Sequence, residues 1–337
     1  MKISIKALSE LTGFSQATVS NALNNKRGVN RETAEKIIQA ARDQGYNVEA
    51  KISKIRFVQY NAGGQVMADT PFFSALIDGV ERAARLSGFE ITIVKLNRDS
   101  EDYEDLRDQI LRDPSSAILL LGTELTEEEA AIYQRGAVAP IVLLDSWFSS
   151  LALNAVLINS AESVRMAVES LIERGHRRIG YLKSTSRIQN FRFRENGYEE
   201  ALRRHSIPIE PAFAFPLTPT MEGAYLDMGE LLNSSPALPT AFFADNDIIA
   251  LGAMKALQEL DYRVPQDVSV IGFDDMPFCS ISSPPLTTVR VFKQEMGHIA
   301  VQRLVELIQG GDTAITKNQI CNEFVERESV QNLTVEK

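Results

Sequence analysis

Apolar residues recur with a helical spacing in the first part of the chain. Ile5, Leu8 and Leu11 lie three residues apart and predict a short helix with one apolar face. Ser4 precedes this segment as a suitable N-cap, and Gly13 follows it as a suitable end. The pattern therefore predicts a short helix that stops at a tight turn.

A second helix is predicted directly after this turn. Ser15 is its expected N-cap, and Val19, Ala22 and Leu23 face inward. The outward face carries Gln16, Ala17, Ser20, Asn21 and Asn24. Two short helices joined by such a turn have the geometry of a helix-turn-helix unit, whose second helix lies in the major groove of DNA.

Residues 31–44 continue the pattern with a third helix, which is apolar at Ala34, Ile37, Ile38 and Ala41. The three helices also suit a plain bundle whose polar face meets only water. The charge distribution separates the two interpretations. Residues 1–56 hold ten Lys and Arg against five Asp and Glu, a net charge of +5, whereas the remaining residues hold 25 against 40, a net charge of −15. A basic module on an acidic protein favours DNA binding at that module.

The body of the chain alternates short apolar runs with amphipathic segments. Predicted strands cover residues 55–60, 90–94, 117–121, 141–144, 156–158, 179–182, 241–243 and 269–271. Predicted helices cover residues 72–86, 103–111, 126–135, 163–174, 194–204, 222–232 and 247–260. Nearly continuous apolar strands are typical of parallel sheets that helices cover on both faces. We therefore expect an α/β body of two doubly wound sheets, with a ligand cleft at the carboxyl ends of the strands.

Composition and motifs exclude several classes of protein. The chain has 337 residues, of which 44% are hydrophobic and 24% charged. It lacks a secretion signal and any apolar run of roughly 18 residues, so we expect a cytoplasmic protein. Cys279 and Cys321 lack metal-ligand spacing, and His176 is expected to be structural. No dinucleotide or phosphate-binding glycine motif occurs, so no cofactor, metal or catalytic residue is expected, and the chain is not expected to be an enzyme.

Several sequence blocks then occur in the order known from one protein family. Among them are Ala-Thr-Val-Ser-x-x-Leu-Asn at 17–24, Arg-Gly-His-Arg-Arg-Ile-Gly at 174–180 and Pro-Pro-Leu-Thr-Thr-Val at 284–289. Others lie at 28–33, 45–46, 69–73, 194–202, 244–253 and 264–275. Over nearly its full length the chain resembles the lactose-repressor/galactose-repressor (LacI/GalR) family of bacterial transcription regulators.

The resemblance implies a two-lobed body similar to the sugar-binding proteins of the bacterial periplasm. It implies a helix-turn-helix domain at 1–46, a short linker at 47–54 and an effector-binding domain at 55–337. Within this last domain, lobe 1 is expected at about 57–158 and 290–318. Lobe 2 is expected at about 159–289 and 319–337.

The resemblance also assigns residues to DNA. The family reads its operator with the start of the second helix, which places Gln16, Ala17 and Asn21 at base edges. Gln and Asn can pair with adenine, and Ala can contact the methyl group of thymine. Expected phosphate contacts are Ser4, Ser15, Thr18, Ser20, Asn24 and Thr33.

The linker departs from the family. Relatives continue after Gly-Tyr with a Pro-Asn pair and a hinge helix, whose Leu wedges into the minor groove. Here residues 47–54 run almost directly into the first strand of the body, without that Leu. Ile52 would either replace the wedge or pack on the body, and the second alternative is favoured. We therefore expect major-groove binding with little bending of the DNA.

For a small-molecule effector, the family supplies polar side chains, which here are Asp145, Arg194, Asn246 and Asp274. Further candidates are Trp147, two residues past Asp145, and Phe72 and Phe73 at the start of a helix. Arg194 is expected to bind two hydroxyl groups with its fork, and Trp147 either stacks on a sugar ring or packs in the fold. Asp247 is either an N-cap or a ligand contact, and Asp275 is expected to bind loop amides.

The resemblance thus implies a repressor whose operator affinity is controlled by a small molecule, expected to be a sugar. The basic residues Lys183, Arg187, Arg192 and Arg194 leave a phosphosugar open as an alternative, and a purine is another. A sugar-binding protein or an enzyme of the same fold is less favoured. We expect operator DNA as partner, a homodimer that reaches two half-sites, and no membrane.

Overall fold

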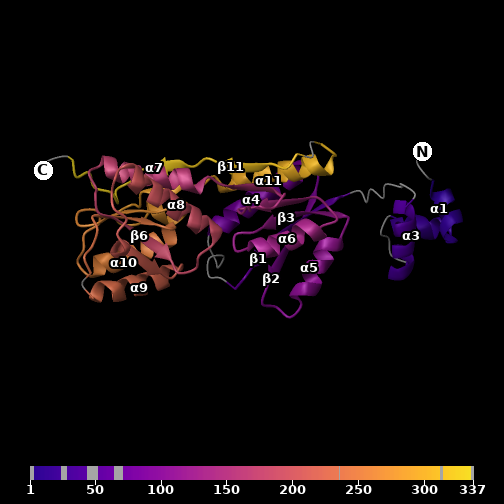
Figure 1. Cartoon of the computed structure of the whole chain (residues 1–337), viewed down its shortest axis with the longest axis horizontal. Helices are drawn as coiled ribbons and strands as arrows, with labels where there is room; N and C mark the ends of the chain where they lie inside the picture. Colours follow the sequence, from indigo (N-terminus) through magenta and orange to yellow (C-terminus); the bar gives the residue numbers. More distant parts are fainter. Residues whose placement is uncertain are drawn as a thin grey trace.

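A computed structural model describes residues 4–23, 29–43, 52–63, 71–234, 236–311 and 314–334. Several sequence predictions fall outside these residues. They concern Asn24, Gly28, the linker up to Lys51, and the parts of family blocks at 45–46 and 69–70. Figure 1 shows a small helical unit, which contains α1 and α3, at one end of the molecule and the larger α/β body beyond it.

The N-terminal unit contains α1 (Ile5–Thr12), α2 (Gln16–Leu23) and α3 (Arg31–Asp43). As expected, the Ser4 side chain caps α1, and Gly13 ends it at a φ of +73°. Leu8, Val19 and Ile37 are fully buried in a common core. The expectation for Leu11 was wrong, because its side chain is 55% exposed. Leu11 lies in the last turn of α1, beyond the reach of the small core.

The first sheet has six strands in the order β11-β5-β4-β3-β1-β2, all parallel. The strands are β1 (Lys54–Asn61), β2 (Glu90–Asn97), β3 (Ser116–Leu121), β4 (Ile141–Leu144), β5 (Asn154–Ile158) and β11 (Lys317–Ile320). Every residue of β3 is buried, which explains its continuous apolar sequence. We call this sheet and the helices that cover it lobe 1.

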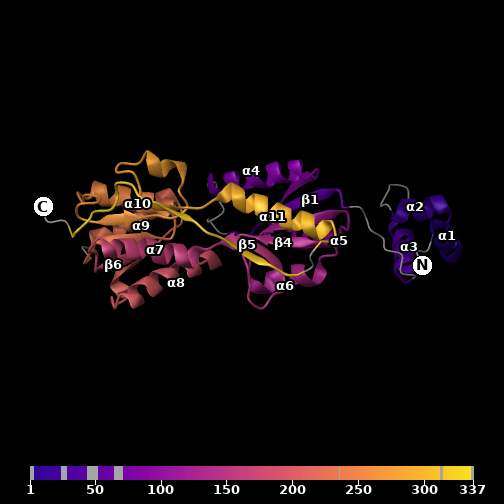
Figure 2. The same ribbon diagram turned by 90° about the horizontal axis from the view of Figure 1, so that it is seen from above.

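Four helices cover the two faces of the first sheet. They are α4 (Pro71–Leu86), α5 (Tyr103–Arg112), α6 (Glu127–Gly136) and α11 (Lys293–Ile308). Helices α4 and α11 lie on one face, and α5 and α6 on the other (Figures 1 and 2). A Cβ atom at Gly79 of α4 would collide with the backbone of Gln294 in α11, so this helix pair requires a glycine.

The second sheet has four parallel strands in the order β7-β6-β8-β9. They are β6 (Ile179–Ser184), β7 (Ala214–Leu217), β8 (Ala241–Ala244) and β9 (Ser269–Ile271). The helices α7 (Ser160–Glu173), α8 (Gln189–Arg204), α9 (Met221–Asn233) and α10 (Asp247–Glu259) surround it, and two 3-10 helices, η1 (Pro211–Phe213) and η2 (Pro277–Ser280), precede β7 and follow β9. We call this unit lobe 2. The expected doubly wound α/β fold is therefore present in both lobes.

The chain passes between the lobes three times. It passes from β5 into α7, from β10 (Thr288–Arg290) into α11, and from β11 into β12 (Glu323–Val325). The last two crossings pair as an antiparallel ribbon between β10 and β12, and Figure 2 shows the C-terminal segment running along both lobes. Strand β11 ends at Ile320 in the first sheet, two residues beyond the limit of 318 that was expected for lobe 1.

Two expectations about the ends of the body can be compared with the structure. Ile52 is partly buried and packs against the main hydrophobic core, which is the favoured alternative to a wedge in DNA. No helix in the described parts of the chain is long and apolar enough to cross a membrane.

Candidate ligand-binding site between the lobes

A cavity lies where the carboxyl ends of strands from both sheets meet. Lobe 1 contributes the start of α4 and the segments that follow β3 and β4. Lobe 2 contributes α8 and the segments that follow β6, β8 and β9. The lining residues are Phe72, Phe73, Thr123, Asp145, Ile188, Asn190, Phe191, Arg194, Asn246, Ile248, Asp274 and Met276. This is the position at which open α/β sheets commonly bind ligands.

Six of the seven side chains expected from the sequence line this cavity. They are Phe72, Phe73, Asp145, Arg194, Asn246 and Asp274. The sequence reasoning missed Thr123, Asn190 and four apolar residues. Thr123 follows a predicted strand directly and could have been found by that position, whereas Asn190 precedes the expected start of its helix and gave no such signal.

Asp145 is held by side chains from both lobes. The hydroxyl of Thr123 donates to one carboxylate oxygen at 2.7 Å, and the amide of Asn190 donates to the other at 2.9 Å. The same amide donates to the carbonyl of Asp145 at 3.1 Å. Burial raises the pKa of Asp145 to about 6, although these hydrogen bonds and nearby Arg194 lower it. Asn190 of lobe 2 therefore bridges to lobe 1 through a carboxyl group that holds a proton more readily than usual.

Arg194 lies at the centre of the lobe 2 wall. Its terminal nitrogens donate to the carbonyl of Asp245 and, at 3.2 Å, to the carboxylate of Asp274. Its guanidinium lies 3.8 Å from the ring centroid of Phe273. The buried Nε has no hydrogen-bond partner in the structure. The expected two-hydroxyl fork is therefore partly occupied by the protein, and Nε is a buried donor without a protein partner.

Two residues at the strand ends adopt a backbone conformation that is rare for non-glycine residues. Asp145 has a φ of +63°, and Asp274 has a φ of +117°. Such residues cost about 1–3 kcal/mol each and persist where the surrounding structure holds them. Both carboxylates thus reach the cavity from strained turns. Burial raises the pKa of Asp274, while Arg194 and Lys293 lower it.

The glycine before this turn is needed for close packing. A Cβ atom on Gly272 would collide with the carboxylate of Asp247. That carboxylate accepts hydrogen bonds from Thr288 at 2.5 Å and from the amide of Met276 at 2.8 Å. Asp247 therefore braces the turn, and the N-cap of α10 is Asn246, which accepts from Ile249 at 2.9 Å. This answers the alternatives left open for Asp247.

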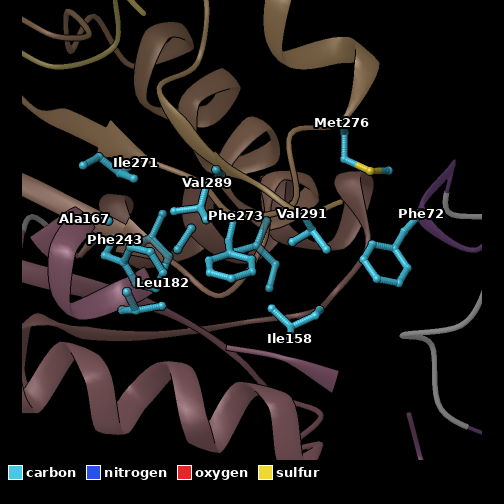
Figure 3. Packing of buried hydrophobic residues seen from close by; sticks show 14 of the residues in the cluster. Phe72, Ile158, Ala167, Leu182, Phe243, Ile271, Phe273, Met276, Val289 and Val291 are labelled. Carbon is cyan, nitrogen blue, oxygen red and sulfur yellow. The ribbon is translucent and has the colours of Figure 1, made fainter. Parts of the chain in front are cut away.

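The apolar part of the cavity continues into the main core. Figure 3 shows Phe72 and Met276 near one end of a cluster that extends through Phe273 into lobe 2. Val291 is part of this cluster and is buried to 3% exposure, so it contributes packing. The cavity in this conformation measures about 30 Å³, roughly the space of one water molecule. A larger ligand therefore requires the lobes or side chains to move apart.

Trp147 is the expected site residue that does not line the cavity. Its ring stacks on Phe193 of α8 at 6.1 Å and 20°. The ammonium group of Lys317 lies 4.7 Å from its ring centroid. Trp147 thus joins lobe 1 to lobe 2 by packing, which is the second of the two alternatives given for it.

The basic residues near the cavity are paired within the protein. Arg187 bonds the buried carboxylate of Asp245 at 2.5 Å and Glu195 at 2.9 Å. Lys183 bonds Glu195 at 2.6 Å. Arg192 is exposed and does not line the cavity. The cations that suggested a phosphosugar are therefore neutralised or placed outside the cavity.

Asp275 and His176 also have protein partners. Asp275 accepts from Arg290 at 2.7 Å and from Arg327 at 2.6 Å, so it binds two guanidinium groups and not the loop amides that were expected. Although burial raises the pKa of Asp275, these two bonds outweigh it and lower the pKa. His176 is buried and bonds Thr240 at 2.9 Å and the carbonyl of Gln331 at 3.0 Å, in agreement with a structural role.

The outer face of α2 carries the residues that were expected to meet DNA. Gln16 and Ala17 are exposed, and Asn21 is partly exposed. The hydroxyl of Ser15 accepts from the amide of Thr18 at 3.1 Å and lies 2.8 Å from the Thr18 hydroxyl. Ser15 therefore caps α2 as expected, and its first turn is held in place from within.

Comparisons with known proteins agree with this architecture. The family described as "Bacterial regulatory proteins, lacI family" matches residues 4–48, and the "Periplasmic binding protein-like domain" matches residues 168–330. The HTH-type transcriptional repressor PurR of Haemophilus influenzae (strain PittEE) is 28% identical over 334 residues, which are 98% of this chain and 99% of that protein. The ribose operon repressor of Escherichia coli (strain K12) is 29% identical over 306 residues, 90% of this chain and 92% of that protein.

Solved structures give the same result for the whole fold. The complex of the transcriptional regulator CelR with cellobiose has a TM-score of 0.72 at 26% identity, covering 97% of this chain and 100% of that chain. The lac repressor dimer bound to operator and the anti-inducer ONPF has a TM-score of 0.73 at 23% identity, covering 98% of this chain and 100% of that chain. The likeness therefore extends over both the three-helix unit and the two lobes.

Proposed function

Because the chain belongs to the lacI family of bacterial regulatory proteins, we propose that it is a transcriptional repressor whose binding to operator DNA is controlled by a small molecule in the cavity between the lobes. The convergence of six expected side chains from both lobes on one cavity carries this proposal. A ligand that contacts both lobes can change their relative orientation, since it binds one arrangement better than another. We expect the repressor to act in the cytoplasm.

The effector we propose is a neutral sugar. Asp145 and Asp274 offer acceptors for hydroxyl groups, and the amide of Asn246 and the unpaired Nε of Arg194 offer donors. Phe72 and Phe191 offer apolar surface. The lining holds one cation against two carboxyl groups, which disfavours an anionic phosphosugar. A purine base remains the second neutral candidate.

A thermal-shift screen of the full chain tests the effector. The panel contains D-ribose, D-glucose and D-galactose, their phosphates, and the bases adenine and guanine. A ligand at a hundred times its dissociation constant stabilises the folded state by about 2.7 kcal/mol. We expect a neutral sugar to raise the melting temperature, and a response to sugar phosphates alone would contradict the proposal.

Two arginines on α8 provide a matched pair of variants. Arg194→Met removes the guanidinium from the cavity wall, whereas Arg192→Met removes an exposed guanidinium two residues away. We expect Arg194→Met to weaken binding of the responding sugar by roughly tenfold or more, because it removes the charged Nε donor and a hydrogen bond to a charged group contributes about 1.5–3 kcal/mol. Isothermal titration measures the affinities, and an equal effect of both variants would argue against the cavity.

The DNA side of the proposal rests on α2. We expect Asn21→Ala to relax preference at one base pair of the operator by about 1–3 kcal/mol, because an Asn amide pairs bidentately with adenine. Thr33→Ala is the control, since loss of a phosphate contact weakens binding to all sequences alike. Binding to a set of single-base operator variants measures both. An unchanged preference profile for Asn21→Ala would remove this residue from base recognition.

We further propose that the protein acts as a homodimer. One helix-turn-helix unit reaches a single half-site, and two-fold symmetry gives access to two half-sites about one DNA turn apart. Analytical ultracentrifugation with and without operator DNA tests this. A monomer that binds a palindromic operator with full affinity would contradict it.

A further inference from the structure

Two consecutive aspartates close the turn after β9, and only the first of them lines the cavity. Asp274 has a φ of +117° and Asp275 a φ of +50°. Asp274 reaches the cavity and bonds Arg194, whereas Asp275 does not line it. A strained pair of this kind needs contacts that hold it.

The carboxylate of Asp275 is held by two arginines on chain segments that cross between the lobes. Arg290, the last residue of β10, donates from Nε at 2.7 Å. Arg327, two residues beyond β12, donates from a terminal nitrogen at 2.6 Å. The side chain of Asp275 is only 10% exposed, so both bonds are shielded from water.

The same segments also hold the backbone of Asp274. Its amide donates to the carbonyl of Val289 at 2.8 Å, and its carbonyl accepts from Lys293 at the start of α11. Arg327 adds a bond from a second nitrogen to the carbonyl of Leu286 at 2.8 Å. The cavity carboxylate is thus fixed to two of the three crossings between the lobes.

We infer that Asp275, with Arg290 and Arg327, is a positioning residue for the effector site. It holds Asp274 in the conformation that meets Arg194, and it ties this contact to the crossings that must bend when the lobes move. The consequence of this inference, that ligand binding is transmitted to the orientation of the lobes, rests on the proposed function. The positioning of Asp274 against Arg194 does not depend on that function.

The two arginines contribute unequally. The side chain of Arg327 is 17% exposed and makes bonds to both Asp275 and the backbone. The side chain of Arg290 is 41% exposed and divides its bonds between Asp275 and Glu323. Changes at Arg327 therefore disturb Asp274 more than the same changes at Arg290.

Nuclear magnetic resonance of the full chain labelled with nitrogen-15 arginine tests the positioning. Asp275→Asn keeps the size of the side chain and removes its charge. We expect it to shift the Nε–H signal of Arg194, assigned by Arg194→Lys, and to leave that of Arg303 unchanged. Arg303 donates its Nε to Asn154 at 2.9 Å, away from the cavity lining, and serves as internal control.

A double-variant comparison separates positioning from general stability. If Asp275 acts through Asp274, then Asp274→Asn and the double variant give the same Arg194 signal. Asp267→Asn breaks a surface pair with Arg263 in the same lobe and should leave that signal in place. Arg327→Lys, which keeps the charge, should give a smaller shift in the same direction as Asp275→Asn and covers the case in which that variant fails to fold. An unshifted Arg194 signal in folded Asp275→Asn or Arg327→Lys overturns the inference.

Titration with D-ribose distinguishes this inference from the proposed function. We expect Asp275→Asn to weaken D-ribose about tenfold, with no further loss in the Asp274→Asn background. If D-ribose and the other neutral sugars bind neither the unaltered chain nor the variants, the sugar assignment fails while the Arg194 signal still decides the positioning. If D-ribose binds the unaltered chain and the Asp275→Asn variant with the same affinity, the inference is overturned.

Discussion

At the scale of single residues, the cavity is notable for buried carboxyl groups. Burial raises the pKa of Asp145 to about 6 and that of Asp247 to about 6 as well. A carboxyl group in the unfolded chain has a pKa of about 3.9. Between these two values each of the two groups binds more protons in the folded chain than in the unfolded chain, so its contribution to the free energy of unfolding falls as the pH rises from about 4 to 6.

We predict that Asp145→Asn reduces the dependence of the free energy of unfolding on pH. Each of the two groups should contribute a loss of about 3 kcal/mol across this interval, because one pKa unit corresponds to about 1.4 kcal/mol. Asp145→Asn keeps the shape and removes the titration, so its stability should fall less between pH 4 and 6.5. Urea unfolding across this range measures it. Parallel curves for the variant and the unaltered chain would contradict the predicted contribution of Asp145.

Single residues also mark how far the sequence could be interpreted. Asp145 and Asp274 were predicted as cavity residues because they follow apolar strands at the family's positions, and both line the cavity. Trp147 was a candidate because it lies two residues after Asp145, but its ring stacks on Phe193 and does not line the cavity. Which way a large ring turns depends on its partner across the lobes, and sequence position carries no information about that partner.

At the scale of elements, the start of a helix could be predicted where a capping side chain marks it in the sequence. The capping box of Thr126 and Glu129 is present, and α6 begins where it was expected. Helix α8 begins at Gln189, five residues before its expected start, after Ile188, which offers no capping side chain. Its first turn is held by contacts such as that of Asn190 with lobe 1. Tertiary contacts that set a helix start leave no local signal.

Helix packing gives a prediction with a matched pair of glycines. Gly79→Ala in α4 should destabilise the chain by about 1–3 kcal/mol, because the added methyl group meets the backbone of α11 in a packed interface. Gly229→Ala in α9 has open space around the added atom and should stabilise it by about 0.5–1 kcal/mol. Urea unfolding of both full-length variants tests the pair. Equal effects of the two substitutions would contradict the close α4–α11 contact.

At the scale of the whole molecule, the two-lobed plan could be predicted and the contacts between the lobes could not. Alternating strands and helices indicated two parallel sheets, which the structure has. Strands β7, β10, β11 and β12 were not predicted as strands, because β7 contains Pro216 and the other three lack a clear apolar run. Strands β10 and β12 form the ribbon between the lobes. They are strands because two segments distant in the sequence pair with each other, and the local sequence pattern does not indicate this pairing.

Because Trp147 lies between the lobes, its fluorescence is an intrinsic probe of the contact between them. It is the only tryptophan in the sequence, and its ring is covered by Phe193 from the other lobe. Phe193→Ala should expose the indole to water, shift its fluorescence emission to longer wavelength and increase quenching by acrylamide. Phe278→Ala removes an exposed ring of η2 in lobe 2 and serves as control. Identical emission in both variants would contradict the stacked arrangement.

The same signal then reports on the gap between the lobes without any attached dye. A ligand that draws the lobes together should protect the indole, and one that separates them should expose it. The sign of the emission change on adding an effector would therefore distinguish a closing from an opening ligand, before any operator is known.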